Sequence, residues 1–203
     1  MILTYAKIFV VSLLLSMGAV GAQTQWTSVK EKDGIEVFRR TYPGSDFQEL
    51  KAVGRIKSDV PRLVQILSDV PSQTSWIPLC VASKTLVGAA PGAMRIYRKF
   101  DNPWPFQDID YVLDQSVSTP SVSGEVVVTF REVADAMPKQ EGCGRMQEYR
   151  GSWRLVPVEG GFLEVTYILH LVPEGASMAT FLNASLGKIG WDTFGALKAY
   201  AGL

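Results

Sequence analysis

The sequence predicts an α+β domain in which a curved antiparallel β-sheet lies around one long C-terminal helix. Residues 177–201 carry a broad apolar stripe at three- and four-residue steps, which predicts a helix about 37 Å long. Most of the chain before this helix has the apolar–polar alternation of strands, with Pro, Gly and Ser at intervals that favour hairpins. A long apolar helix that ends a β-rich chain needs a sheet to lie on.

The composition fits one globular domain. The chain has 203 residues, of which 47% are hydrophobic and 20% are charged, and we find no internal repeat. We expect no cofactor and no metal site, because no metal-ligand spacing or phosphate-binding glycine loop occurs.

The N-terminus has the features of a secretory signal peptide. Lys7 precedes an uncharged run over residues 8–22, and Val20, Gly21 and Ala22 are small enough for a cleavage site. The run is shorter than the roughly 20 residues of a membrane span, although an uncleaved anchor is the alternative. We therefore expect cleavage after Ala22, a single domain over residues 23–203, and a secreted, periplasmic protein.

Charge and cysteine usage limit the partners. The full chain has 20 basic and 20 acidic residues, so loss of Lys7 leaves a net charge of −1. Without a basic patch we expect no nucleic-acid partner, and any membrane contact would be apolar and transient. We expect a monomer. Cys80 and Cys143 would enter an oxidising compartment, but the sequence leaves open whether they are close enough for a disulfide.

The remaining elements follow from local patterns. A first helix should begin at Ser58 or Asp59, with Pro61 in its first turn, and end before Pro71, followed by a short helical turn over residues 72–77. Two prolines keep residues 101–107 out of any sheet. The expected strands are 26–29, 35–40, 47–56, 81–87, 94–100, 108–118, 125–133, 145–156 and 162–172.

Three glycines lie inside the last helical pattern, at Gly187, Gly190 and Gly195. Each costs about 1 kcal/mol relative to alanine in a helix interior. Two explanations are open, namely close packing against the sheet or a helix that bends and lifts.

The last two strands predict an apolar interior with polar atoms in it. One strand places Leu163, Val165, Tyr167, Leu169 and Leu171 on one face. The other places Gln147, Tyr149, Gly151, Trp153 and Leu155 on one face. Tyr, Trp and Gln atoms need hydrogen-bond partners, as in a large pocket with a few polar groups. The alternative is that the tyrosines reach solvent at the rim of the sheet.

Several short sequence strings, taken together with their order along the chain, resemble those of START domains. Residues 103–112, PWPFQDIDYV, are similar to the family pattern PWP-x-x-D-R-D-[YF]-V. Further similar strings are Asp33–Val37, Trp76-Ile77, Arg145-Met146, Gly151–Trp153, Val165–Tyr167 with His170 and Pro173, and Phe181–Asn183. The similarity runs from about Trp26 to the C-terminus, and its strength comes from the order and spacing of these strings.

This resemblance implies a helix-grip fold of the START/Bet v 1 type. It also implies a hydrophobic tunnel for one lipid between sheet and helix, and a gate made by that helix and residues 101–107. The chain departs from the pattern at Ile109, where the family has arginine, so Asp108 and Asp110 are left without that local partner. Gln115 stands near the place where some members have a tunnel arginine, and its neutral amide suggests recognition of a hydroxyl, carbonyl or ester rather than a buried ion pair. Arg98 on the neighbouring strand still offers a charge to a phosphate headgroup.

The expected site follows from the strand faces together with this resemblance. The gate residues would be Trp104, Phe106 and Met178, of which Trp104 and Phe106 either insert into a bilayer surface or pack under their loop. The lipid-binding cavity would be lined by Arg98, Tyr111, Leu113, Gln115, Tyr149, Trp153, Val165, Tyr167, Leu169, Phe181, Leu182 and Ile189.

No catalytic constellation is recognisable in the sequence. His170, the only histidine, lies away from the apolar face of its strand, as an ordinary surface or hydrogen-bonded histidine would. Asn183 begins a glycosylation sequon, but the sequon lies inside the predicted helix, so we do not expect it to be glycosylated.

We therefore expect a carrier that binds a single lipid, with mild preference for a phospholipid, and moves it across the periplasm or extracellular space. Two alternatives are a helix-grip enzyme of the cyclase or hydrolase kind and a scaffold with a filled core. The enzyme would draw its acid or base from Arg98, Asp110, Glu148 or Tyr167.

Overall fold

The computed structural model describes residues 25–104, 106–174 and 179–203. The predicted signal peptide lies outside these ranges, as does the predicted gate residue Met178.

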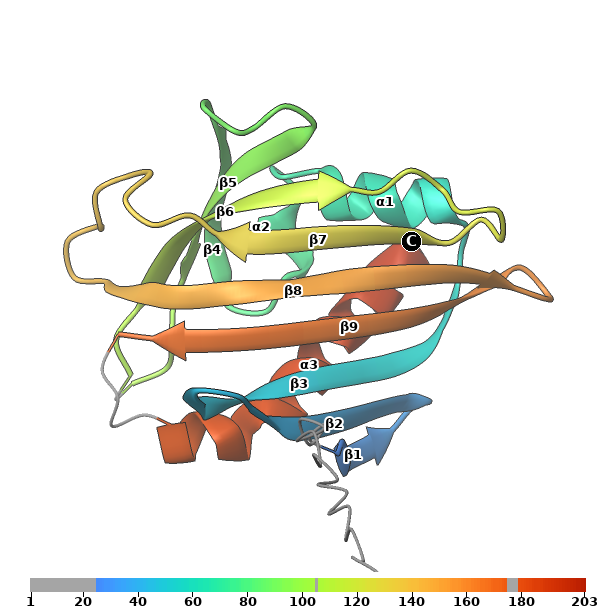
Figure 1. The fold of residues 1–203 in the computed structure, drawn as a ribbon, viewed down its shortest axis with the longest axis horizontal. Helices are drawn as coiled ribbons and strands as arrows, with labels where there is room; N and C mark the ends of the chain where they lie inside the picture. The colour runs from blue at the N-terminus through green and yellow to red at the C-terminus, as the bar shows by residue number, and fades with distance from the viewer. Residues whose placement is uncertain (1–24, 105, 175–178) are drawn as a thin grey trace, which may run out of the picture.

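Within the described ranges the chain forms nine strands and three helices (Figure 1). The helices are α1 (Val60–Ser68), α2 (Gln73–Trp76) and α3 (Ala179–Ala201). The strands are β1 (Thr27–Lys32), β2 (Ile35–Tyr42), β3 (Ser45–Lys57), β4 (Cys80–Leu86), β5 (Ala93–Phe100), β6 (Ile109–Val117), β7 (Val126–Glu132), β8 (Gly144–Val158) and β9 (Phe162–Pro173). Every expected element is present, and most boundaries shift by one or two residues.

The strands form a single sheet in the order β1-β2-β3-β9-β8-β7-β6-β5-β4. Neighbours pair antiparallel, and a short parallel contact between β6 and β8 brings Ile109 opposite Gly144. Figure 1 shows the sheet in front and the helices behind it, with α3 crossing the back of the sheet diagonally. The predicted α+β class, a curved antiparallel sheet around a C-terminal helix, is confirmed.

Helix α1 begins where the sequence predicts. The Asp59 side chain accepts a hydrogen bond from the Arg62 backbone N–H at 2.8 Å, and Pro61 occupies the first turn. Leu63, Ile66 and Leu67 are buried, which turns α1 toward the sheet and leaves its polar face in solvent.

Helix α3 packs mainly against β3 and β2, through buried Leu186, Phe194 and Leu197. A Cβ atom added at Gly190 would lie 2.8 Å from Val37 Cγ1, so this glycine is there for close packing. A Cβ atom at Gly195 would lie an ordinary 3.7 Å from Ile35 Cδ1. The close-packing explanation therefore holds at Gly190 and does not extend to Gly195.

Polar side chains tie α3 to β1, to β3 and to the turn between β1 and β2. Asn183 Oδ1 accepts from the Gln48 backbone N–H at 2.8 Å, and Asn183 Nδ2 donates to the Asp46 carbonyl at 2.9 Å. Further along, Trp191 Nε1 donates to the Lys32 carbonyl at 3.1 Å, and Lys198 donates to the carbonyl before Gly34. Both halves of α3 are thus attached to the same side of the sheet.

The expected inward position of Gln147 is wrong. The register between β8 and β9 shifts between Met146 and Glu148, so one extra residue is accommodated there as a β-bulge. Met146 is buried in the core, whereas Gln147 is exposed. Beyond the bulge the predicted alternation resumes, with Trp153 and Leu155 buried.

The two cysteines are both buried and free. Cys80 pairs with Phe100 of β5, which pairs with Ile109 of β6, which in turn lies opposite Gly144. Cys143 directly precedes Gly144, so three strand spacings of about 4.8 Å separate the two cysteines, which is more than a disulfide spans.

The two aspartates near the missing arginine lack that local partner, but each is paired with a cation from another strand. Asp108 pairs with Lys99 at 3.0 Å. Asp110 is fully buried and accepts two hydrogen bonds from Arg145, at 2.8 and 3.2 Å, and a third from the Gln140 backbone N–H. Because Arg145 comes from β8, the partner is close in space although 35 residues away.

His170 lies on the outer face of the sheet, as predicted, but it is buried rather than at the surface, and neither ring nitrogen has a hydrogen-bond partner of standard geometry among the described residues. Its ring stacks on Tyr42 with centroids 3.9 Å apart, and Arg150 lies over the Tyr42 ring. Its Nε2 atom is 3.8 Å from Glu148. Burial lowers the pKa of His170, an effect that Glu148 opposes and Arg150 reinforces.

Candidate functional site

A small cavity lies between the sheet and the helices, where the sequence places the site. Its volume is about 30 Å³. It is lined by Leu67, Trp76, Ile77, Arg98, Gln115, Phe130, Tyr149, Trp153, Tyr167 and Thr193. The structure thus brings five of the predicted cavity residues together, from β5, β6, β8 and β9, and the only charged one is Arg98.

Aromatic rings fill most of the space around this cavity. Trp153 stacks on Tyr167 with centroids 4.0 Å apart, and Tyr111 stacks on Tyr149 at 4.2 Å. Phe130 packs against Tyr149 at 5.4 Å. A volume of about 30 Å³ holds one water molecule, whereas ligand pockets measure about 300–1,000 Å³. The interior is therefore closed in this conformation, and the predicted open tunnel is absent from it.

The polar groups at the cavity form a connected set. Arg98 Nε donates to Gln73 Oε1 at 2.8 Å, and Ser83 Oγ donates to the same oxygen at 2.7 Å. The Leu67 carbonyl at the end of α1 accepts from Gln73 Nε2 and from Gln115 Nε2, at 3.2 and 3.1 Å. These bonds hold the α1–α2 segment against β5 and β6.

The tyrosines lie inside the protein and not at the rim of the sheet. Tyr111 and Tyr167 are buried, and burial raises both phenol pKa values well above their usual range. These hydroxyls are neutral hydrogen-bond donors at physiological pH. The Tyr111 hydroxyl has no hydrogen-bond partner of standard geometry among the described residues.

The other predicted cavity residues differ in position. Tyr111, Leu113, Val165 and Leu169 are buried in the core that surrounds the cavity. Leu182 and Ile189 of α3 are half-buried and pack against that core. Phe181, near the start of α3, is 50% exposed and contacts Phe106 instead of the cavity.

Sequence reasoning missed the contribution of the two short helices. Leu67, Trp76 and Ile77 line the cavity, and Gln73 positions Arg98. Trp76-Ile77 was visible as a string of the resemblance, but without a role. Phe130 and Thr193 carried no sequence signal that separated them from core and helix-face residues.

The loop over residues 101–107 contacts α3 through an aromatic pair. Phe106 stacks on Phe181 with ring centroids 4.4 Å apart. The neighbouring Trp104 is 92% exposed, so it does not pack under its loop. Asn102 Nδ2 donates to the Gln107 carbonyl at 2.9 Å, which closes the loop on itself.

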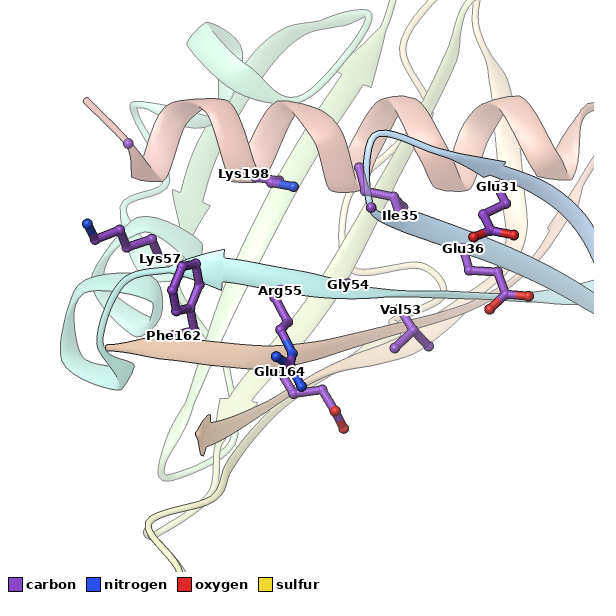
Figure 2. A pocket seen from close by; sticks show the side chains of 12 residues that line it. Glu31, Ile35, Glu36, Val53, Gly54, Arg55, Lys57, Phe162, Glu164 and Lys198 are labelled. Carbon is purple, nitrogen blue, oxygen red and sulfur yellow. The ribbon is translucent and has the colours of Figure 1, made fainter. Parts of the chain in front are cut away.

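A larger, open groove of about 640 Å³ lies elsewhere, at the edge between the β1–β2 hairpin, β3, β9 and the end of α3 (Figure 2). Its lining includes the charged side chains of Glu31, Glu36, Arg55, Lys57, Glu164 and Lys198. Apolar Ile35, Val53 and Phe162 also line this groove, but the charged side chains around them suit an acyl chain less well than the aromatic lining of the interior cavity, which remains the candidate site.

Among the described residues, no group of three or more His, Cys, Asp or Glu side chains could hold a metal ion. None of the helices in those ranges is both long and apolar enough to cross a membrane.

Comparison with known proteins gives the fold its name. No protein-family model matches the chain. An uncharacterized protein of Pseudomonas aeruginosa is 27% identical over 176 residues, which is 87% of this chain and 86% of that protein. The crystal structure of a STAR-related lipid transfer protein from Xanthomonas axonopodis superposes with a TM-score of 0.80 and 27% identity, over 88% of this chain and 99% of that one. The chain has the fold of a START domain.

More distant structures share the fold alone. Human STARD10 superposes with a TM-score of 0.76 at 13% identity, over 87% of this chain and 72% of that one. The Zhui aromatase/cyclase of Streptomyces superposes with a TM-score of 0.58 at 11% identity, over 76% of this chain and 93% of that one. This fold therefore occurs both in a lipid-transfer protein and in an aromatase/cyclase. The choice between a carrier and an enzyme has to be argued from the residues of the site.

Proposed function

We propose that this START-type protein binds a single lipid between its sheet and α3, and carries it across the periplasm. The observation that carries the proposal is the ring of Tyr149, Trp153 and Tyr167 around an interior cavity that also holds Arg98 and Gln115. Apolar rings suit an acyl chain, which costs about 0.8 kcal/mol per CH₂ group in water, while a few polar groups suit its headgroup. The similarity to the Xanthomonas lipid transfer protein supports this assignment.

Lipid entry requires the closed interior to open, and the contacts favour one route. Helix α3 is held to β1–β3 by hydrogen bonds at Asn183, Trp191 and Lys198. The loop over residues 101–107 meets α3 through the Phe106–Phe181 stack. We therefore place the moving part in this loop, with α3 fixed on the sheet, and assign to exposed Trp104 the transient contact with a membrane.

The periplasmic location is part of the proposal and depends on the N-terminal sequence. The uncharged run after Lys7 and the small residues before position 23 support export and cleavage after Ala22. Mass measurement of the protein recovered from the periplasmic fraction tests this: a mass that begins at Gln23 is expected, and an intact Met1 or a cytoplasmic protein would contradict it.

Native mass spectrometry of the protein, purified without detergent, tests lipid binding. We expect one discrete added mass per chain, released by organic solvent and identifiable in the extract. A protein that is bare on purification, and still bare after incubation with mixed phospholipid vesicles, would contradict the proposal.

An enzyme of the cyclase kind is the alternative, since the Zhui aromatase/cyclase has the same fold. Of the four acid or base candidates, Arg98 and Tyr167 line the cavity. Asp110 is bound by Arg145, and Glu148 pairs with Arg150 near outer-face His170. Recovery of the bound molecule chemically unchanged after prolonged incubation supports the carrier, whereas a new product would favour the enzyme.

A further inference from the structure

We propose that the interior site selects lipids that carry an anionic group, a phosphate or a carboxylate, and that the Arg98 guanidinium binds this group. The inference rests on the proposed lipid-binding function and names the class of ligand for that site.

Arg98 is a buried cation without a counter-charge. Its side chain comes from β5 and points to the same side as Ile96, and the residue is 7% exposed. No carboxylate among the described residues lies within ion-pair distance of it. The nearby aspartates on β6 are engaged elsewhere, since Asp110 pairs with Arg145 and Asp114 pairs with Arg95.

A cation in this position is costly unless something compensates it. Buried charges are normally paired, because their loss of hydration is large. The protein supplies a neutral amide instead, the Gln73 side chain, which fixes the guanidinium through its Nε atom. The planar guanidinium has further N–H donors and matches phosphate and carboxylate oxygens in pairs. An anionic lipid group would therefore meet an oriented, uncompensated charge.

The surroundings of Arg98 match an anion as well. The residues that line the cavity include no Asp and no Glu. Thr193 contributes a hydroxyl to the lining, and the buried Tyr111 hydroxyl lies next to the Arg98 charge. Neutral donors beside one cation accommodate extra anionic oxygens, whereas a neutral headgroup such as a free hydroxyl would leave the charge of Arg98 unpaired.

Competition for loading tests the inference. The full-length gene product, purified without detergent and stripped by organic extraction and refolding, would be offered vesicles of dioleoylphosphatidylglycerol with equal minor amounts of oleic acid and dioleoylglycerol. Native mass spectrometry then gives the bound fraction of each lipid, normalised to the vesicle composition. We expect the protein to favour an anionic lipid over dioleoylglycerol. A bound phosphatidylglycerol identifies a phosphate site and a bound oleate identifies a carboxylate site.

Three variants separate recognition from structure. Arg98→Met should lower the ratio of anionic to neutral lipid by about tenfold or more while still loading dioleoylglycerol. Arg98→Lys keeps a charge at the site and should retain part of the preference for anionic lipids. This variant can still be measured if Arg98→Met fails to fold. Arg95→Met is the matched control, because Arg95 is on the opposite face of β5 and pairs with Asp114, so its ratio should equal that of the wild type.

The outcomes are distinguishable. Wild-type protein that loads dioleoylglycerol as well as the anionic lipids, or Arg98→Met and Arg98→Lys variants that keep the full preference, would overturn the inference and leave lipid binding intact. Wild-type protein that loads none of the three lipids, and carried none when first purified, would overturn the proposed function itself.

Discussion

The ring of Phe106 lies on the ring of Phe181 with centroids 4.4 Å apart and planes inclined by 29°. One ring belongs to the loop over residues 101–107 and the other to the first turn of α3, which hydrogen bonds hold on β3 through Asn183. The stack therefore joins a loop to a fixed helix, and its strength controls how readily the two separate.

Replacing Phe106 with alanine should speed lipid exchange. An aromatic pair contributes about 0.5–1.5 kcal/mol beyond its buried area, so its loss should raise the rate of transfer between fluorescently labelled vesicles by about two- to tenfold. Because Phe181 is half exposed, the free energy of unfolding should change little. Val122→Ala, in an exposed loop elsewhere, is the control and should leave the rate unchanged. Equal or slower transfer by the Phe106 variant would place the opening elsewhere.

Two glycines of the same helix should respond oppositely to alanine. At Gly190 the new methyl group would meet Val37 Cγ1 at 2.8 Å and Leu50 Cδ1 at 3.3 Å, so Gly190→Ala should destabilise by about 1–3 kcal/mol. At Gly195 the nearest atom is 3.7 Å away, so Gly195→Ala should stabilise by up to about 1 kcal/mol through helix propensity. Urea unfolding measures both. Changes of the same sign in the two variants would show that α3 is not packed as described.

The buried pair of Asp110 and Arg145 should be important for stability. Asp110→Ala leaves Arg145 without its carboxylate and removes the acceptor of the Gln140 N–H, so we expect a loss of about 3 kcal/mol. The exposed pair of Lys139 and Glu174 is the comparison, and Lys139→Ala should cost no more than about 1 kcal/mol. Urea unfolding of the two variants at neutral pH gives these values. Similar losses would mean that the Asp110 pair is no stronger than a surface pair.

His170 predicts a dependence of stability on pH. Its pKa is lowered in the folded state, mainly by burial, so between that pKa and the unfolded value of about 6.5 the unfolded chain binds more protons. The stabilising contribution is therefore fully present above about pH 6.5 and is lost as the pH falls toward the folded pKa. The groups that face the imidazole are Glu148 and Arg150 on β8, Glu49 on β3 and Tyr42 on β2.

His170→Phe keeps a ring against Tyr42 but cannot be protonated. We expect the free energy of unfolding of the wild type to fall more steeply than that of the variant between pH 7 and pH 5, as measured by urea unfolding at each pH. Parallel curves would show that protonation of His170 is not coupled to folding. Taking the difference between the two proteins cancels the carboxylates, such as Asp108 and Glu174, that titrate in both.

Much of the fold was predictable because its signals are local. The Asp59 cap, the apolar stripe of α3 and the strand alternation each depend on residues a few positions apart. The error at Gln147 arose where a single extra residue enters β8 as a bulge. A bulge shifts the alternation by one residue and has no mark in composition, so the sequence could not show it.

The site was only partly predictable. Arg98, Gln115, Tyr149, Trp153 and Tyr167 were found because they lie on strand faces that alternate regularly. Gln73 was missed, because its role depends on α2 folding back over β4 and β5. The partner of Asp110 was missed for the same reason, since Arg145 reaches it from another strand.

The sequence by itself determined the order of the elements, the inward face of most strands and the α+β class, since periodicity and turn residues act over short distances. Only the tertiary structure decided that the interior is closed around about 30 Å³, that α3 is fixed to β1–β3, and that Arg98 stands without a counter-charge. These properties depend on how side chains from strands that are far apart in the sequence pack and pair with one another. A local sequence pattern contains no information about such contacts.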